Sequence, residues 1–213
     1  MLKIIRDFLP QKKALELSNK IYDTPEHWWS YAIKHNEELS YLNNSLRDYH
    51  AKGRLEKELE ERFQAGKFSY KFKRSTSHVK GCNCYECTFT IDYLQNILKN
   101  TVLKETGWND CKVSENFISA YQSGDFLSIH TDETRGVAYI LNLTSGWKPE
   151  YGGMLNVLQE DGTFKAIFPE FNSLILMETG QEGGTPHFVS EVSKYAPFHR
   201  VAFSGWYDEV PRD

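Results

Sequence analysis

The chain of 213 residues lacks long apolar runs: none approaches the roughly 20 residues that a membrane-spanning helix needs. The opening residues, Met1 to Asp7, also lack the apolar core of a signal peptide.

Cysteines are few. Three of the four, Cys82, Cys84 and Cys87, are crowded together, which is a poor layout for the disulfide framework of a secreted protein. We therefore expect a cytoplasmic protein with reduced thiols and no membrane partner.

An excess of positive charge is absent as well. Lys and Arg number 25 against 29 Asp and Glu, which gives a formal net charge of −4. Such a balance provides no general attraction to nucleic acid, so no nucleic-acid partner is expected.

The length fits a single domain over residues 1–213 that buries a substantial core. Aromatic residues make up 14% of the chain, which predicts a core rich in rings.

Residues 1–111 are predicted to be a mostly helical N-terminal support. Apolar residues recur at helical spacing after Pro10, and Thr24 followed by Pro25 is typical of a helix start. Helices are predicted at Gln11 to Tyr22, from Thr24 through Trp29, from about Leu39 to Phe63, and at Thr90 to Lys104.

Residues 112–213 change to short β-branched and aromatic runs separated by Gly, Asn, Asp and Pro. The predicted strands are Phe117 to Tyr121, Val137 to Leu143, Met154 to Leu158, Phe164 to Phe168, Ser173 to Met177, Phe188 to Val192 and Arg200 to Tyr207. Many short strands at this spacing indicate a sandwich or barrel. We predict a mainly β protein with additional helices, whose core is a jelly roll (double-stranded β-helix).

The triplet His130-Thr131-Asp132 is predicted to lie on a strand. Residues i and i+2 of a strand share a face, so the imidazole and the carboxylate can bind adjacent positions on one metal ion. An H-x-D triplet often arises by chance, and a polar strand end with a surface His and Asp is the ordinary alternative. The pair becomes informative only with a third ligand.

His187, which follows a glycine-rich turn, is the candidate third ligand. Two histidines and one carboxylate form a facial triad that leaves one side of the metal open, as in non-haem Fe(II) oxygenases. Zinc accepts a similar ligand set in hydrolases. His199 is the alternative distal ligand, but it adjoins Arg200 and must face the opposite side of the same strand.

Arg200 opens a run whose apolar residues predict a buried strand. A buried guanidinium needs an anion, and a carboxylate bound through two hydrogen bonds is its natural partner. The distal carboxylate of 2-oxoglutarate meets this need while its keto-acid end chelates iron. A structural ion pair with a nearby Asp or Glu is the alternative.

At this point the sequence resembles the prolyl-hydroxylase-like branch of the 2-oxoglutarate/Fe(II) dioxygenases. The resemblance spans about Val113 to Tyr207. It rests on the tyrosine, Gly-Asp and H-x-D block from Tyr121 to Asp132, the strand Arg135 to Leu143, the paired glycines of Tyr151 to Leu155, and the segments Pro186 to Val192 and Arg200 to Tyr207. The opening, Ile5 to Pro10, resembles the family's short strand before the first helix.

The resemblance implies a hydroxylase that couples oxidative decarboxylation of 2-oxoglutarate to hydroxylation of a C–H bond. It makes His130, Asp132 and His187 the iron ligands and Arg200 the anchor for 2-oxoglutarate, with Tyr121 adding a hydrogen bond. Because Asp132 is present, the related halogenases are disfavoured. Ala202 stands where many relatives have Ser or Thr, so one carboxylate contact differs. Ascorbate is the implied reductant.

The substrate stays open between a prolyl residue in a protein or peptide and a free amino acid or small metabolite. Arg135, Trp147 and Trp206 are candidate residues of the substrate mouth, and ordinary surface or core positions explain them equally well. A zinc hydrolase and a non-catalytic jelly-roll binding module are the alternatives from other classes.

Two further segments stand out. His78, Cys82, Cys84 and Cys87 have the ligand types of a small zinc site, although the spacing within residues 78–87 is tighter than in the usual zinc knuckles. The stretch from Phe68 to Arg74 alternates aromatic and basic residues, so its positive side could guide an acidic substrate. Strand patterning alone accounts for it equally well.

Overall fold

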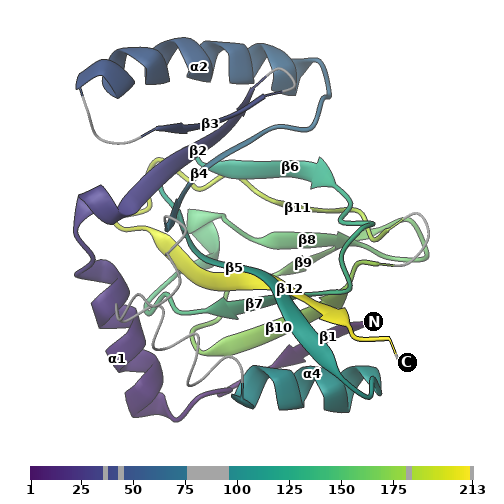
Figure 1. The fold of residues 1–213 in the computed structure, drawn as a ribbon. Helices are drawn as coiled ribbons and strands as arrows, with labels where there is room; N and C mark the ends of the chain where they lie inside the picture. The colour runs from purple at the N-terminus through teal and green to yellow at the C-terminus, as the bar shows by residue number, and fades with distance from the viewer. Residues whose placement is uncertain (36–37, 43–45, 76–95, 181–183, 212–213) are drawn as a thin grey trace.

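A computed structural model describes residues 1–35, 38–42, 46–75, 96–180 and 184–211 (Figure 1). Within these ranges, twelve strands form one hydrogen-bonded sheet in the order β1-β10-β7-β12-β5-β4-β6-β11-β8-β9, with β2 pairing β3 and β4 beside this path. The cysteine-rich segment, residues 78–87, lies outside the described residues, and so does the candidate zinc site.

The strands from the N-terminal half are β1 (Leu2–Ile5), β2 (Trp29–His35), β3 (Glu38–Leu42) and β4 (Tyr70–Ser75). Those of the C-terminal half are β5 (Cys111–Tyr121), β6 (Phe126–His130), β7 (Val137–Asn142), β8 (Leu155–Leu158), β9 (Phe164–Ile167), β10 (Ser173–Glu178), β11 (His187–Val189) and β12 (Arg200–Glu209).

The sheet curls into a half-barrel because β4 joins its two halves. Lys73 and Arg74 pair with β5, whereas Tyr70 and Lys71 pair with β6. One layer therefore contains β1, β10, β7, β12 and β5, and the other contains β6, β11, β8 and β9 (Figure 1). The predicted jelly-roll fold class is confirmed.

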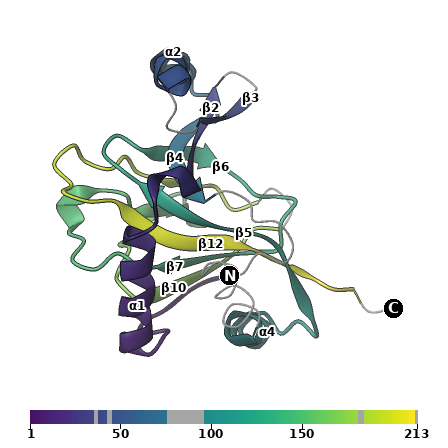
Figure 2. The same ribbon diagram turned by 60° about the vertical axis from the view of Figure 1, so that its left-hand side comes forward.

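Alternation along the strands separates two hydrophobic clusters. On β7, Tyr139 and Leu141 belong to a cluster that includes Leu17 of α1 (Gln11–Tyr22) and Val102 of α4 (Lys99–Thr106). Ala138 of the same strand belongs instead to a second cluster shared with β8 and β11. The two helices thus cover one face of the β7 layer (Figure 2), and the opposite face lines the inside of the half-barrel.

The helix α2 (Leu46–Gln64) lies over β2 and β3 at the other end of the molecule (Figure 1). Leu55 and Leu59 of this helix pack against Tyr31 and Ile33 of β2. These elements form a third, smaller cluster, which extends the sheet beyond the half-barrel.

Several predicted elements agree with the structure and others do not. The first helix has the predicted bounds, and all seven predicted strands after residue 112 are present with shifts at their ends. The predicted helix through Trp29 is wrong: a single 3₁₀ turn, η1 (Glu26–Trp28), leads directly into β2. The Thr24-Pro25 pair therefore starts only this single turn, and Trp29 already pairs with Ser75 of β4.

Besides its helices, the segment 1–111, predicted to be mostly helical, also supplies β1 to β4. The predicted helix from Leu39 begins only at Leu46, because residues up to Leu42 pair with β2 as β3. The predicted helix at Thr90 to Lys104 corresponds to α4 at Lys99–Thr106, and its first residues lie outside the described ranges. No helix among the described residues is long and apolar enough to cross a membrane.

A buried carboxyl ties β2 to the half-barrel. Asp125, in the turn between β5 and β6, is fully buried; it accepts hydrogen bonds from the Tyr31 hydroxyl and, at 3.0 Å, from the Gln122 amide. Burial outweighs these two bonds and raises the pKa of Asp125 to about 7. The folded state therefore binds more protons at Asp125 than the unfolded chain does between about pH 4 and 7.

The raised pKa of Asp125 determines the direction in which pH changes the stability of the protein. Because the pKa is raised on folding, the contribution of Asp125 is present below the unfolded pKa and is lost as pH rises through about 7. We expect the free energy of unfolding of the wild type to fall by on the order of 2 kcal/mol, relative to Asp125→Asn, between pH 5 and 8. Denaturant titrations at both pH values measure this, with the exposed Asp161→Asn as the control. Parallel pH profiles for wild type and Asp125→Asn would contradict the prediction.

Candidate metal centre

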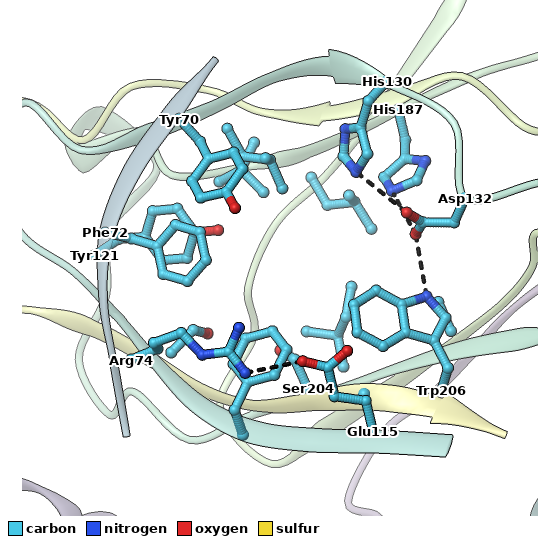
Figure 3. A pocket seen from close by; sticks show the side chains of 18 of the residues that line it. Tyr70, Phe72, Arg74, Glu115, Tyr121, His130, Asp132, His187, Ser204 and Trp206 are labelled. Carbon is cyan, nitrogen blue, oxygen red and sulfur yellow. Dashed lines mark hydrogen bonds and ion pairs between the residues drawn. The ribbon is translucent and has the colours of Figure 1, made fainter. Parts of the chain in front are cut away.

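Three side chains from separate parts of the chain converge inside the half-barrel: His130, Asp132 and His187. Their candidate ligand atoms all lie within 4.8 Å of one another (Figure 3). His130 ends β6 and His187 begins β11, and the two residues are direct partners in the antiparallel β6–β11 pair. Asp132 follows two residues after the end of β6. The prediction placed this triplet at the start of a strand, whereas the structure has the strand ending at its first residue.

Backbone carbonyls orient both imidazoles. Nδ1 of His130 lies 3.0 Å from the Ser128 carbonyl oxygen, and Nδ1 of His187 lies 2.8 Å from that of Thr185. An N–H at each Nδ1 donates to these acceptors, which leaves the Nε2 lone pair free to bind a metal. Each Nε2 also lies 3.6 Å from an Asp132 carboxylate oxygen.

The surroundings of His130 favour its neutral form, the form that binds metals. Burial and the proximity of His187 lower the pKa of His130. Phe68 stacks on the His130 ring with centroids 4.9 Å apart. Trp206 Nε1 donates a hydrogen bond of 3.1 Å to Asp132 Oδ2, which holds the carboxylate toward the two histidines. The donor set is thus a preformed group of two imidazoles and one carboxylate.

Arg200 lies on the inner face of β12 and is 2% exposed. Its Nη2 donates to the Asn142 side-chain oxygen at 3.2 Å, but its Nε has no hydrogen-bond partner. Among the described residues, no carboxylate forms an ion pair with it, and burial lowers its pKa. The alternative of a structural ion pair therefore has no support in the described part of the chain. A buried cation of this kind fits an anionic ligand.

Tyr121 and Gly153 border the Arg200 side chain. Tyr121 is the β5 partner of Arg200, and the guanidinium carbon lies 5.3 Å from the centre of its ring. A Cβ at Gly153, whose φ is +66°, would approach the Arg200 Cδ to 3.0 Å. The second of the paired glycines therefore leaves room for the arginine.

The His-Asp-His group, Arg200 and Tyr121 line one cavity of about 380 Å³ inside the half-barrel (Figure 3). Its walls are largely aromatic and apolar, and its ionisable side chains are the metal group, Arg200, Arg74, Glu115 and four tyrosines. Such a site combines a low-polarity environment with a few fixed charges, as binding sites for small ligands do.

The other candidate residues are distributed differently. Trp206 lines the cavity, whereas Arg135 lies at its edge, bonded to Glu115. Trp147 does not line this cavity: it packs against Tyr151 and Phe198 and donates to the Gly152 carbonyl. His199 is also outside the lining, as expected from its alternation with Arg200.

The sequence analysis considered only the basic side of the stretch Phe68 to Arg74 for a role at the site, and it did not consider Glu115. In the structure the aromatic side chains of this stretch, Phe68, Tyr70 and Phe72, line the cavity, as does Glu115 of β5. Alternation along β12 places Trp206 on the same face as Arg200 and could have linked it to the metal group. No comparable signal in the sequence indicates that β4 crosses the open side of the half-barrel.

The group fits Fe(II) and 2-oxoglutarate. Two imidazoles and a carboxylate can occupy one face of an octahedral ion and leave the opposite face for a chelating keto acid. The unpaired Arg200 in the same cavity can receive the second carboxylate of that co-substrate.

Comparisons with known proteins agree with this geometry. Residues 117–208 match the family model described as the 2OG-Fe(II) oxygenase superfamily. A mouse protein, prolyl 3-hydroxylase OGFOD1, is 33% identical over 95 residues, which cover 41% of this chain and 17% of the relative. The chain thus matches only a small part of that longer protein.

Solved structures share the fold at low sequence identity. A prolyl hydroxylase from Trichoplax adhaerens has a TM-score of 0.61 at 15% identity, covering 98% of this chain and 83% of the other. A prolyl-4-hydroxylase from Pseudomonas putida has a TM-score of 0.55 at 17% identity, with 99% and 93% covered. A viral collagen prolyl hydroxylase from Paramecium Bursaria Chlorella virus-1 has a TM-score of 0.55 at 13% identity, with 98% and 96% covered.

Proposed function

We propose that this chain is an oxygenase of the 2OG-Fe(II) superfamily and that it hydroxylates a C–H bond of a prolyl residue in a protein or peptide. The match of residues 117–208 to the family model supports the first part, and the similarity to a prolyl 3-hydroxylase supports the second. The observation that carries the proposal is the presence, in one cavity, of a His-Asp-His group and a buried arginine without an ion-pair partner among the described residues. The relative and the similar folds support the prolyl substrate.

The proposed roles follow from the contacts. His130, Asp132 and His187 hold Fe(II), and the carbonyls and Trp206 that bond to them keep the three donors aimed at one point. Arg200 binds the distal carboxylate of 2-oxoglutarate, with Asn142 fixing one edge of its guanidinium.

Tyr121 completes the proposed co-substrate site. Its ring is 4% exposed and stacks on Phe72, with centroids 4.9 Å apart. Burial raises the pKa of its hydroxyl, so the group stays neutral and keeps its proton for a hydrogen bond to the co-substrate.

When bound, iron and 2-oxoglutarate supply the oxidising chemistry, and the chain supplies position and a dry environment. The aromatic wall formed by Phe68, Tyr70 and Phe72 excludes water from the face of the cavity next to His130. The aromatic wall limits where a substrate can lie beside the metal. It therefore restricts which C–H bond of the substrate is oxidised.

An anaerobic titration tests the proposal. Adding Fe(II) and 2-oxoglutarate should give the weak visible absorption of the chelate, roughly near 500 nm. Screening prolyl peptides, free amino acids and small metabolites for stimulated succinate formation, with mass spectrometry for a product heavier by one oxygen atom, then identifies the substrate. A colourless mixture that forms no succinate in air would contradict the oxygenase. Stimulation by a free amino acid alone would replace the peptide substrate.

A further inference from the structure

The aromatic and basic stretch that forms β4 places one cation inside the cavity. Lys71 and Lys73 point away from the cavity and pair with Glu56 and Glu26. Arg74 faces inward with Tyr70 and Phe72, on the wall across from the metal group (Figure 3). Alternation along β4 thus separates two lysines that pair with glutamates outside the cavity from a single arginine inside it.

Arg74 is held in a defined orientation. Its Nη2 lies 3.0 Å from Glu115 Oε1, and its guanidinium carbon lies 4.1 Å from the centre of the Phe117 ring. Its side chain is 15% exposed. Stacking on an aromatic face leaves the edge of a guanidinium, where its N–H donors lie, available to a further acceptor.

Glu115 does not neutralise Arg74 alone, because it is shared. Its other oxygen, Oε2, lies 2.9 Å from Arg135 Nη2, and Arg135 in turn lies over the ring of Trp206. Two guanidinium groups therefore share one carboxylate, which leaves a surplus of one positive charge at the cavity wall. With Arg200 assigned to the co-substrate, this surplus is available to the substrate.

We propose that Arg74 determines specificity by binding a carboxylate of the substrate while the reacting C–H bond lies at the metal group. This inference rests on the proposed function and extends it to the substrate class. The carboxylate comes either from an acidic side chain next to the prolyl residue of a peptide or from the α-carboxylate of a free amino acid. A charge-assisted hydrogen bond in a partly buried site favours an acidic substrate over its neutral amide.

Matched pairs of substrates test the assignment. The peptide arm compares blocked tripeptides with Glu or Gln directly before or after proline, and the free amino-acid arm compares proline with prolinamide. Succinate formation is measured for wild type, Arg74→Gln and Arg74→Lys. For the wild type we expect at least one acidic probe to exceed its amide partner by roughly tenfold or more in kcat/KM.

The variants then connect this preference to Arg74. Arg74→Gln should make the acid and its amide nearly equal, whereas Arg74→Lys should retain part of the preference, because it keeps the charge without the planar fork. Lys73→Gln is the matched control: it removes a cation of the same strand that pairs with Glu26 and does not line the cavity, so it should keep the preference. Circular dichroism checks that each variant is folded.

The experiment distinguishes a failure of the Arg74 assignment from a failure of the proposed function. If the Fe(II) and 2-oxoglutarate chelate forms but no acidic probe exceeds its amide partner in the wild type, the assignment of Arg74 is overturned while the oxygenase stands. A preference that survives in Arg74→Gln also overturns it. If no chelate forms, it is the proposed function that fails.

Discussion

Replacing either histidine of the metal group, as His130→Ala or His187→Ala, is expected to abolish substrate-stimulated succinate formation, with a loss of at least about a hundredfold. A facial set cut to two ligands loses both affinity for Fe(II) and the geometry of the open face. The metal content after desalting should fall together with the activity. Both readouts depend on Nε2 atoms that the Ser128 and Thr185 carbonyls hold in position.

His199→Ala is the control for this prediction. Its imidazole does not line the cavity, and it adjoins Arg200 on the opposite face of the chain. The variant should retain iron and turn over at close to the wild-type rate. If His199→Ala were inactive while His187→Ala kept full activity, the distal ligand would be wrongly assigned.

Much of this site could be predicted because its signals are local. The alternation of Arg200 with His199 depends only on the geometry of a strand. The spacing of two residues keeps His130 and Asp132 close together, even though the strand ends at His130. The glycines before His187 mark a turn by their backbone freedom. Each of these signals lies within a few residues, so no knowledge of strand order was needed.

The remaining features depend on contacts between distant segments. The pairing of His130 with His187 joins residues 57 positions apart, and the wall formed by β4 requires that strand to bridge β5 and β6. Local propensity predicted a helix from about Leu39, where β3 forms, because these residues suit either structure until their pairing with β2 is known. The shared role of Glu115 between two arginines is likewise a tertiary property.

These distant contacts also separate the two arginines of the cavity. Arg74 has an acidic partner that it shares, whereas Arg200 is fully enclosed and bonded only to a neutral amide among the described residues. Enclosure without a counter-charge is costly, so Arg200 should depend on its ligand more strongly than Arg74 does. The sequence placed both residues on strands, but only the structure distinguishes their surroundings.

Arg200→Lys is expected to raise the apparent KM for 2-oxoglutarate by roughly ten- to a hundredfold. The substitution keeps the charge but loses the planar fork that binds a carboxylate through two hydrogen bonds. Losing one charged hydrogen bond in such a site costs on the order of 1.5–3 kcal/mol, which corresponds to that change in KM. Iron retention should barely change, since Arg200 is not one of the three clustered donors.

Arg200→Ala should raise the KM further, because it leaves the distal carboxylate of the co-substrate buried without a cation. A shorter 2-oxo acid without that carboxylate, such as 2-oxobutanoate, should then lose its disadvantage relative to 2-oxoglutarate. Kinetics with both acids on wild type and the two variants measure this change in preference, and Arg200→Lys guards against misfolding of the alanine variant. An unchanged KM in both variants would remove the co-substrate role and leave Arg200 as a structural residue bonded to Asn142.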